Sequence, residues 1–181
     1  MPTKTIMVGI KGISPLLMHR FPMEPIEAIE KKSMEEQAEI SCYRDPETKE
    51  LYIPGDAIQR ALVSAATYSK GKGRATLQKN AAACVLVTPE RVSLGVKKYV
   101  IDSRGVVNPP TRGRIIRHRA KLEEWEATFD LEYDDTLLTE PQVRQIVDDM
   151  GRRVGLLDFR PEKKGAFGRS MVVSWKTADQ G

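Results

Sequence analysis

The sequence predicts an α+β domain in which an antiparallel sheet is covered by helices on one face. Two observations predict this class: apolar residues alternate in several short segments, and two apolar stripes with helical spacing lie between those segments. The resulting order of strand, helix, several strands, helix and strand is typical of split β-α-β or ferredoxin-like sheets. The chain of 181 residues has the length of one domain, and we find no internal repeat or domain boundary in it.

Two strands and a short helix are predicted in the first third of the chain. Apolar residues alternate over Thr5–Ile10 and indicate a strand. Ser33 and Glu36 form a capping-box pair, so a short helix is expected over Met34–Ile40. Leu51–Ile53 follows a turn and has the composition of a second, shorter strand.

Two longer helices are predicted from their first residues and their apolar stripes. Asp56 caps the first helix, whose apolar positions are Ile58, Ala61, Leu62 and Ala65. A basic loop with alternating glycines, residues 69–74, follows it. The second helix opens at Thr139–Pro141, and its apolar stripe comprises Val143, Ile146, Val147, Met150 and Val154.

The remaining strands are predicted in the second half of the chain. Arg114–Lys121 and Trp125–Tyr133 are typical of strands, and the second alternates apolar residues with acids and threonine. A final strand places four apolar residues in one phase with Arg169, namely Phe167, Met171, Val173 and Trp175. The segment Ala81–Val87 fits either a helix or a strand.

Composition excludes several classes of protein. Cys42 and Cys84 are too few to staple a fold of this size, which excludes a disulfide scaffold. No segment approaches the roughly 18 to 20 apolar residues of a membrane span, and the N-terminus lacks the apolar region of a secretory signal. No zinc-ligand spacing, phosphate-binding loop or nucleophile elbow is present. We therefore expect a cytoplasmic protein that uses no metal, cofactor or membrane.

Charge is segregated along the chain, although the net charge is only +4. Residues 24–50 hold nine acids against four bases, and residues 123–149 hold ten acids against one base. Three basic clusters, at residues 70–79, 97–121 and 152–169, each contain arginine and glycine. A single cluster is most simply a solvated surface, but three of them favour a polyanionic partner.

The candidate catalytic groups do not predict an enzyme. The acids of residues 123–149 alternate as on a solvent-facing surface, which argues against a metal-dependent nuclease. His19 has no evident partner for acid–base catalysis of RNA cleavage. His118 lies between two arginines that favour its neutral ring, and it is either a base or phosphate contact or an ordinary strand residue. We predict a binding protein with no catalytic residue.

The stretch Gly155–Arg169 carries the most specific local pattern, because a helix runs into a basic, glycine-containing loop and then into a strand. Gly165 and Gly168 allow a ligand to approach the backbone, with N–H groups free for phosphate. The alternative is a loop in which the glycines are needed only because the backbone adopts positive φ angles there.

The segment Leu51–Leu62, which places Ile-Pro-Gly before a helix, and the glycine loop Gly165–Arg169 carry a family resemblance. Both resemble RAMP proteins, the RRM-like backbone and processing subunits of CRISPR effectors. Thr111–Arg119 and Gly155–Pro161 also resemble small uncharacterised proteins of phages and prophages. The resemblance implies a single RRM-like domain over residues 1–181 with basic loop insertions, single-stranded nucleic-acid binding and head-to-tail assembly. The histidine of the processing nucleases has no established counterpart, so the resemblance gives His19 no catalytic role.

We predict a non-catalytic protein that binds single-stranded nucleic acid and assembles cooperatively along it as a homo-oligomer. The phage-like texture favours DNA, in replication or recombination within a bacterial host cell. The alternatives are a CRISPR-type RNA-binding subunit, a metal-independent endoribonuclease that uses His19 or His118, and a module that binds acidic proteins.

The predicted contacts must meet after folding in one continuous cationic track. Stacking surfaces are expected at Tyr68, Phe159 or Phe167. The predicted phosphate contacts are Lys70, Lys72, Arg74, Lys79, Arg112, Arg114, Arg117, His118, Arg119, Lys121, Arg160, Lys163, Lys164 and Arg169.

Overall fold

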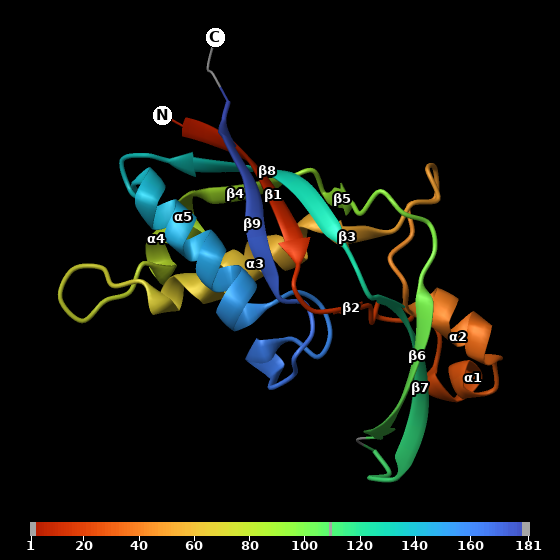
Figure 1. Ribbon diagram of the computed structural model, residues 1–181. Helices are drawn as coiled ribbons and strands as arrows, with labels where there is room; N and C mark the ends of the chain where they lie inside the picture. Colours follow the sequence, from red (N-terminus) through yellow and green to blue (C-terminus); the bar gives the residue numbers. More distant parts are fainter. Residues whose placement is uncertain (1–2, 109, 179–181) are drawn as a thin grey trace.

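Four antiparallel strands form the central sheet of the computed structural model, which describes residues 3–108 and 110–178 (Figure 1). Their order across the sheet is β4 (Val85–Thr88), β8 (Glu126–Asp134), β1 (Thr3–Gly12) and β9 (Ser170–Thr177). Helix α3 (Gly55–Ala65) lies between β1 and β4 in the chain, and α5 (Glu140–Asp149) lies between β8 and β9. The chain therefore follows the β-α-β-β-α-β order of a ferredoxin-like sheet, which confirms the predicted α+β class.

The helices cover one face of this sheet. Ile6, Val8 and Ile10 of β1 are at most 1% exposed and belong to one apolar core with the stripes of α3 and α5. Thr139 and Gln142 form the capping box that begins α5. The opposite face of the sheet is open and exposes large apolar side chains, namely Met7, Leu86, Met171 and Val173.

Strand β9 departs from the sequence prediction. Met171, Val173 and Trp175 were expected to share one face, but a register shift in the pairing with β1 changes the phase of the strand. Val172 and Trp175 pack against the core, whereas Met171 and Val173 are each 53% exposed. A bulge adds one residue to one strand only, and alternation read from the sequence cannot detect it.

A long hairpin extends away from the central sheet (Figure 1). It consists of β6 (Val100–Val107) and β7 (Arg114–Leu122), and β2 (Leu16–Leu17) pairs with the base of β7. Helix α2 (Met34–Ser41) packs on one face of the hairpin, with the short α1 (Ile26–Glu30) beside it.

Short elements complete the fold. Strands β3 (Tyr52–Pro54) and β5 (Arg91–Ser93) form a two-stranded sheet. The ambiguous segment Ala81–Val87 divides at Cys84, where α4 (Gln78–Cys84) ends and β4 begins. The single-turn elements are η1 (Ala66–Tyr68), η2 (Met150–Val154) and η3 (Pro161–Lys163), and η2 continues the predicted stripe of α5.

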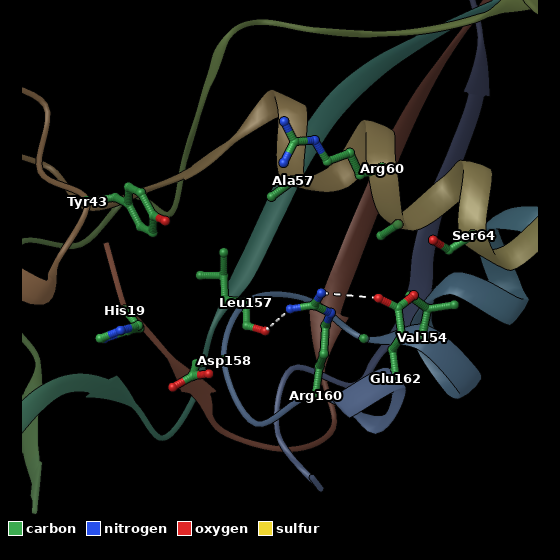
Figure 2. Close-up of a pocket in the computed structure, with 12 residues that line it drawn as sticks. His19, Tyr43, Ala57, Arg60, Ser64, Val154, Leu157, Asp158, Arg160 and Glu162 are labelled. Atoms are coloured by element: carbon green, nitrogen blue, oxygen red, sulfur yellow. Dashed lines mark hydrogen bonds and ion pairs between the residues drawn. The ribbon is translucent and has the colours of Figure 1, made fainter. Parts of the chain in front are cut away.

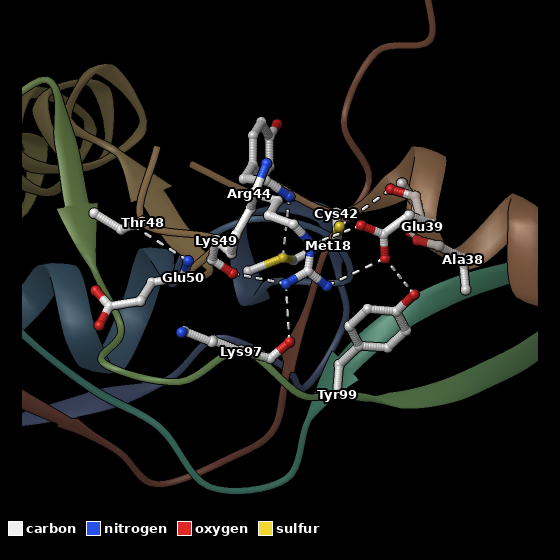
Figure 3. A network of polar contacts seen from close by, with 12 residues as sticks. Met18, Ala38, Glu39, Cys42, Arg44, Thr48, Lys49, Glu50, Lys97 and Tyr99 are labelled. Atoms are coloured by element: carbon white, nitrogen blue, oxygen red, sulfur yellow. Dashed lines mark hydrogen bonds and ion pairs between the residues drawn. The ribbon is translucent and has the colours of Figure 1, made fainter. Parts of the chain in front are cut away.

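A polar network fixes the base of the hairpin (Figure 3). The Arg44 guanidinium donates to both carboxylate oxygens of Glu39, at 2.6 and 3.2 Å, and to the carbonyl oxygens of Lys49 and Lys97, at 2.8 and 3.0 Å. The Tyr99 hydroxyl donates to the same carboxylate at 2.7 Å. These bonds hold the pKa of Glu39 below its ordinary value. The network thus joins α2 to the segment that enters β6.

No helix within residues 3–108 and 110–178 has the length and apolar content needed to cross a membrane. Both cysteines are free thiols.

Candidate nucleic-acid interface

The β6–β7 hairpin carries its cations mainly on the face that points toward the body of the protein. Arg104 of β6 lies opposite Arg117 of β7, and Asp102 lies opposite Arg119. Arg104 is paired with Asp102 at 2.7 Å, whereas Arg117 forms no ion pair within the part of the chain that the structure describes. Opposed like charges repel each other, so an anion beside Arg117 would be favoured. His118 points to the other face, where its Nδ1 lies 2.7 Å from Ser103 Oγ.

Two of the predicted phosphate contacts are used inside the molecule instead. The Arg119 side chain is 8% exposed and is hydrogen-bonded to Asp158. Burial lowers the pKa of Arg119, and the Asp158 carboxylate opposes this shift. Lys121 is 18% exposed and pairs with Glu123 at 2.9 Å and with Asp102 at 3.7 Å. We therefore correct the prediction for Arg119 and Lys121. Arg119 attaches the C-terminal loop (residues 155–169) to the hairpin, and Lys121 is paired with carboxylates in and beside the hairpin.

The glycine loop is tightly folded on itself. A methyl group on Gly165 would overlap the Phe159 carbonyl oxygen, and one on Gly168 would overlap the Leu156 carbonyl oxygen. The N–H of Gly165 donates to Arg160 at 3.0 Å, and that of Gly168 donates to Pro15 at 2.8 Å. The expectation that these two N–H groups are free for phosphate is therefore wrong. The glycines serve close backbone packing.

The two phenylalanines of this loop are covered. Phe159 and Phe167 contact each other edge to face at 6.4 Å between ring centroids. The Arg104 guanidinium lies over both rings, at 5.2 and 4.7 Å from their centroids, and Arg119 lies 5.7 Å from Phe159. Cation–π contacts of this kind stabilise the junction of loop and hairpin. Both rings are only partly exposed, because each is packed against the other ring as well as against a guanidinium, which makes them poor surfaces for base stacking.

A cavity of about 310 Å³ lies between α3 and the C-terminal loop (Figure 2). Arg60 and Ser64 of α3 form one wall, and His19 and Arg160 form part of the other. Arg160 donates to the Leu157 carbonyl oxygen at 2.8 Å and to Glu162 at 3.1 Å, so its charge is partly satisfied within the protein. Arg60 forms no ion pair with any described residue.

His19 lies between this cavity and the hairpin. It lines both the cavity and a small recess of about 30 Å³ at the edge of β7, beside Arg117. The pKa of His19 lies below its ordinary value, because surrounding atoms desolvate the ring and because Arg119 and Arg117 repel a second positive charge. Asp158 opposes this shift. The neutral imidazole is therefore the dominant form at neutral pH.

Two further cavities adjoin the first one. The first shares the wall residues Ser64, Val154 and Glu162 with a cavity of about 390 Å³, and that cavity shares Tyr68 and Arg153 with one of about 370 Å³. We call this row of three adjoining cavities the α3 groove. It begins beside the hairpin and ends beside Lys70, at the start of the basic loop.

Of the predicted contacts, Lys70 and Arg160 line this groove, and the others lie outside its walls. The loop of residues 69–76 and the hairpin lie at opposite ends of the molecule, with η3 between them (Figure 1). Lys70, Lys72, Arg74 and Lys79 are exposed at one end, Lys163 and Lys164 at the end of η3, and Arg112 and Arg114 near the hairpin tip. Arg169 is exposed at the start of β9. The one continuous track expected from the sequence is thus replaced by separate basic segments.

Several groove residues escaped the sequence analysis. Arg60 and Ser64 lie on α3 beside its apolar stripe, and Tyr43 comes from a segment that carries no motif. Arg153 belongs to the basic cluster of residues 152–169 but was not selected as a contact. The sequence feature that could have indicated Arg60 is its position on α3 next to the core stripe, where the small side chains of Ala57 and Ala61 leave space beside it.

Neither a family model nor a curated protein matches the sequence. The structure is similar to a chain of a type III-B Cmr-beta complex bound to cognate target RNA, with a TM-score of 0.60 and 13% identity. The similarity covers 97% of this chain and 60% of the other, so this chain spans about three fifths of its neighbour. At this identity the similarity shows the fold alone, and it agrees with the predicted ferredoxin-like α+β class. The phage or prophage origin stays a prediction.

Proposed function

We propose that the protein binds single-stranded RNA along the α3 groove, as an RNA-binding subunit of RAMP type. The observation that carries the proposal is the course of the groove, which runs from the C-terminal loop to the basic loop through shared wall residues and adjoins the recess beside Arg117 of the hairpin at His19. A flexible strand follows such a path more readily than a rigid duplex does, and cations at its borders neutralise phosphates.

The open face of the sheet is a poor alternative surface for the strand. Glu126, Asp130 and Glu132 of β8 are on this face, and its exposed large side chains are aliphatic rather than aromatic. Acids repel phosphates, and aliphatic side chains offer no ring on which a base can stack. This face therefore provides a control surface within the same molecule.

RNA is proposed ahead of DNA because the structural neighbour belongs to a complex bound to target RNA. The sequence resemblance to phage proteins favoured DNA, and a competition experiment distinguishes the two predictions. Labelled single-stranded RNA is bound, then competed with unlabelled single-stranded RNA, single-stranded DNA or duplex at several salt concentrations. We expect RNA to compete best and duplex to compete weakly. Equal competition by duplex would refute a single-strand groove, and stronger competition by DNA would restore the DNA prediction.

A paired set of variants assigns binding to the groove. Arg60→Ala and Arg117→Ala each remove a cation that has no carboxylate partner among the described residues, and each should weaken RNA binding. Lys11→Ala and Lys176→Ala remove exposed charges from the opposite face of the sheet and should leave affinity unchanged. Equal losses in both pairs would contradict the proposed path.

We also propose that the protein binds without cleaving. His19 forms no hydrogen bond with a carboxylate or hydroxyl among the described residues, and His118 Nδ1 is engaged with Ser103. Incubation of the protein with labelled RNA, with and without Mg²⁺, should leave the strand intact on a denaturing gel. Cleavage that disappears in His19→Ala or His118→Ala would establish the endoribonuclease alternative.

Assembly along the strand completes the proposal. The acidic open face of one copy complements the basic borders of another, which favours cooperative binding. Light scattering should give a mass that rises in steps with RNA length, whereas one protein per strand at every length would exclude self-assembly.

A further inference from the structure

The far end of the α3 groove contains an aromatic side chain that the fold leaves available. Three stacking candidates follow from the sequence, but Phe159 and Phe167 are covered by each other and by Arg104. Tyr68, at the end of η1, is 53% exposed and lines both outer cavities of the groove. An exposed aromatic ring inside a groove, rather than in the core, is typical of a site for a flat ligand.

Arg153 is held in place beside this ring. Its Cζ atom lies 4.9 Å from the Tyr68 ring centroid, and its Nε forms an ion pair with Asp149 Oδ1 at 3.2 Å. Asp149 is only 5% exposed, and its second oxygen accepts from Gln145 Nε2 at 3.2 Å. A buried carboxylate with two donors cannot easily move, so the guanidinium is positioned before any ligand binds.

Polar groups surround the ring and the guanidinium. The Ser69 hydroxyl is buried without a hydrogen-bond partner among the described residues, and Ser69 lines the outermost cavity of about 370 Å³. Lys70 lies at the rim of the same cavity and is exposed. The site therefore combines a ring, a planar cation and an exposed ammonium, which match the base, its polar edge and the phosphate of one nucleotide.

We propose that Tyr68 and Arg153 form a seat for one unpaired nucleobase, with Lys70 contacting the adjoining phosphate. This inference rests on the proposed function, because it assigns a specific base contact within the same groove. The seat ends the path of the strand at the basic loop, far from the hairpin (Figure 1).

Affinity measurements with matched variants test the seat. Tyr68→Ala should weaken binding of single-stranded oligouridine about five-fold or more, the loss typical of one stacked aromatic. Tyr68→Phe keeps the ring and should bind within about two-fold of the original protein. Met171→Ala, which alters an equally exposed side chain on the open face, should have no effect. Unchanged affinity of Tyr68→Ala, while Arg117→Ala weakens binding, would overturn the seat and leave the groove proposal standing.

Photo-crosslinking gives an independent readout. Oligonucleotides that contain 5-bromouridine are irradiated with the protein, and the crosslinked peptides are identified by mass spectrometry. We expect a crosslink at Tyr68 that is lost in Tyr68→Ala. Crosslinks confined to the hairpin and the C-terminal loop would overturn the seat alone, whereas no crosslink on any groove wall would overturn the proposed function as well.

Discussion

Replacement of Gly168 by alanine tests whether the C-terminal loop is a rigid wall of the groove. Gly168 has φ of +74°, a left-handed conformation that costs an L side chain about 1–2 kcal/mol. An added methyl group would overlap the Leu156 carbonyl oxygen and lie 2.8 Å from the Leu156 nitrogen. The two chain segments must then separate, which loses the 3.0 Å bond from the Leu156 N–H to the Gly168 carbonyl oxygen, worth about 1 kcal/mol.

These contributions predict that Gly168→Ala lowers the free energy of unfolding by about 2–3 kcal/mol. Gly95→Ala is the matched control, because Gly95 has φ of +68° but no atom within 4 Å of an added methyl group. It should cost about 1–2 kcal/mol, the backbone contribution alone, and therefore about 1 kcal/mol less than Gly168→Ala. Urea denaturation of both variants measures the difference. Equal losses would refute the close packing of the loop.

The same substitution links stability to function. Arg160 of this loop lines the groove, so displacement of the loop should weaken RNA binding, whereas Gly95→Ala should bind as the original protein does. Loss of stability with unchanged affinity would exclude this loop from the binding surface.

Three further predictions concern buried and paired charges. Asp158→Ala leaves the buried Arg119 unpaired and should lower the free energy of unfolding by about 2 kcal/mol. The double variant Arg119→Met/Asp158→Asn removes both charges and should recover half or more of this loss. An equal loss in the double variant would refute the pairing. The lowered pKa of His19 means that the unfolded chain takes up a proton first, so stability falls as the pH drops below about 6.5, and His19→Gln should flatten that fall in denaturation curves measured from pH 7 to 5. The lowered pKa of Glu39 also makes stability fall on acidification, because the stability that its carboxylate contributes above about pH 4.5 is lost when the carboxylate is protonated. Glu39→Gln weakens the bond from Arg44, so it should lower the free energy of unfolding at pH 7 by about 1 kcal/mol. The variant should also lose less stability than the original protein between pH 6 and 3. An acid-side profile that neither variant alters would contradict both assignments.

The fold was largely accessible from the sequence because its main elements have strong local signals. The stripes of α3 and α5 and the alternation in β1 and β8 require no tertiary information. The boundary at Cys84 and the bulge in β9 were missed, since each depends on how a strand pairs with its neighbour.

The site was only partly accessible, because charge alone does not reveal pairing. Arg119 and Lys121 have the same sequence context as Arg117, yet only Arg117 remains without an ion pair among the described residues. The difference arises from Asp102 and Asp158, which lie at distant positions in the chain. The groove itself was unpredictable, because its walls come from α3, η2 and the C-terminal loop.

The salt dependence of RNA binding tests the central claim most directly. Each phosphate that a cation neutralises releases counterions, so the slope of log affinity against log salt falls by about 0.7 per contact removed from a single strand. We predict that the combined Arg60→Ala and Arg117→Ala variant binds oligouridine with a slope about 1.4 shallower, whereas combined Lys11→Ala and Lys176→Ala leaves the slope unchanged. Equal slopes in all three proteins, or a slope near zero in the original, would contradict RNA binding along the α3 groove.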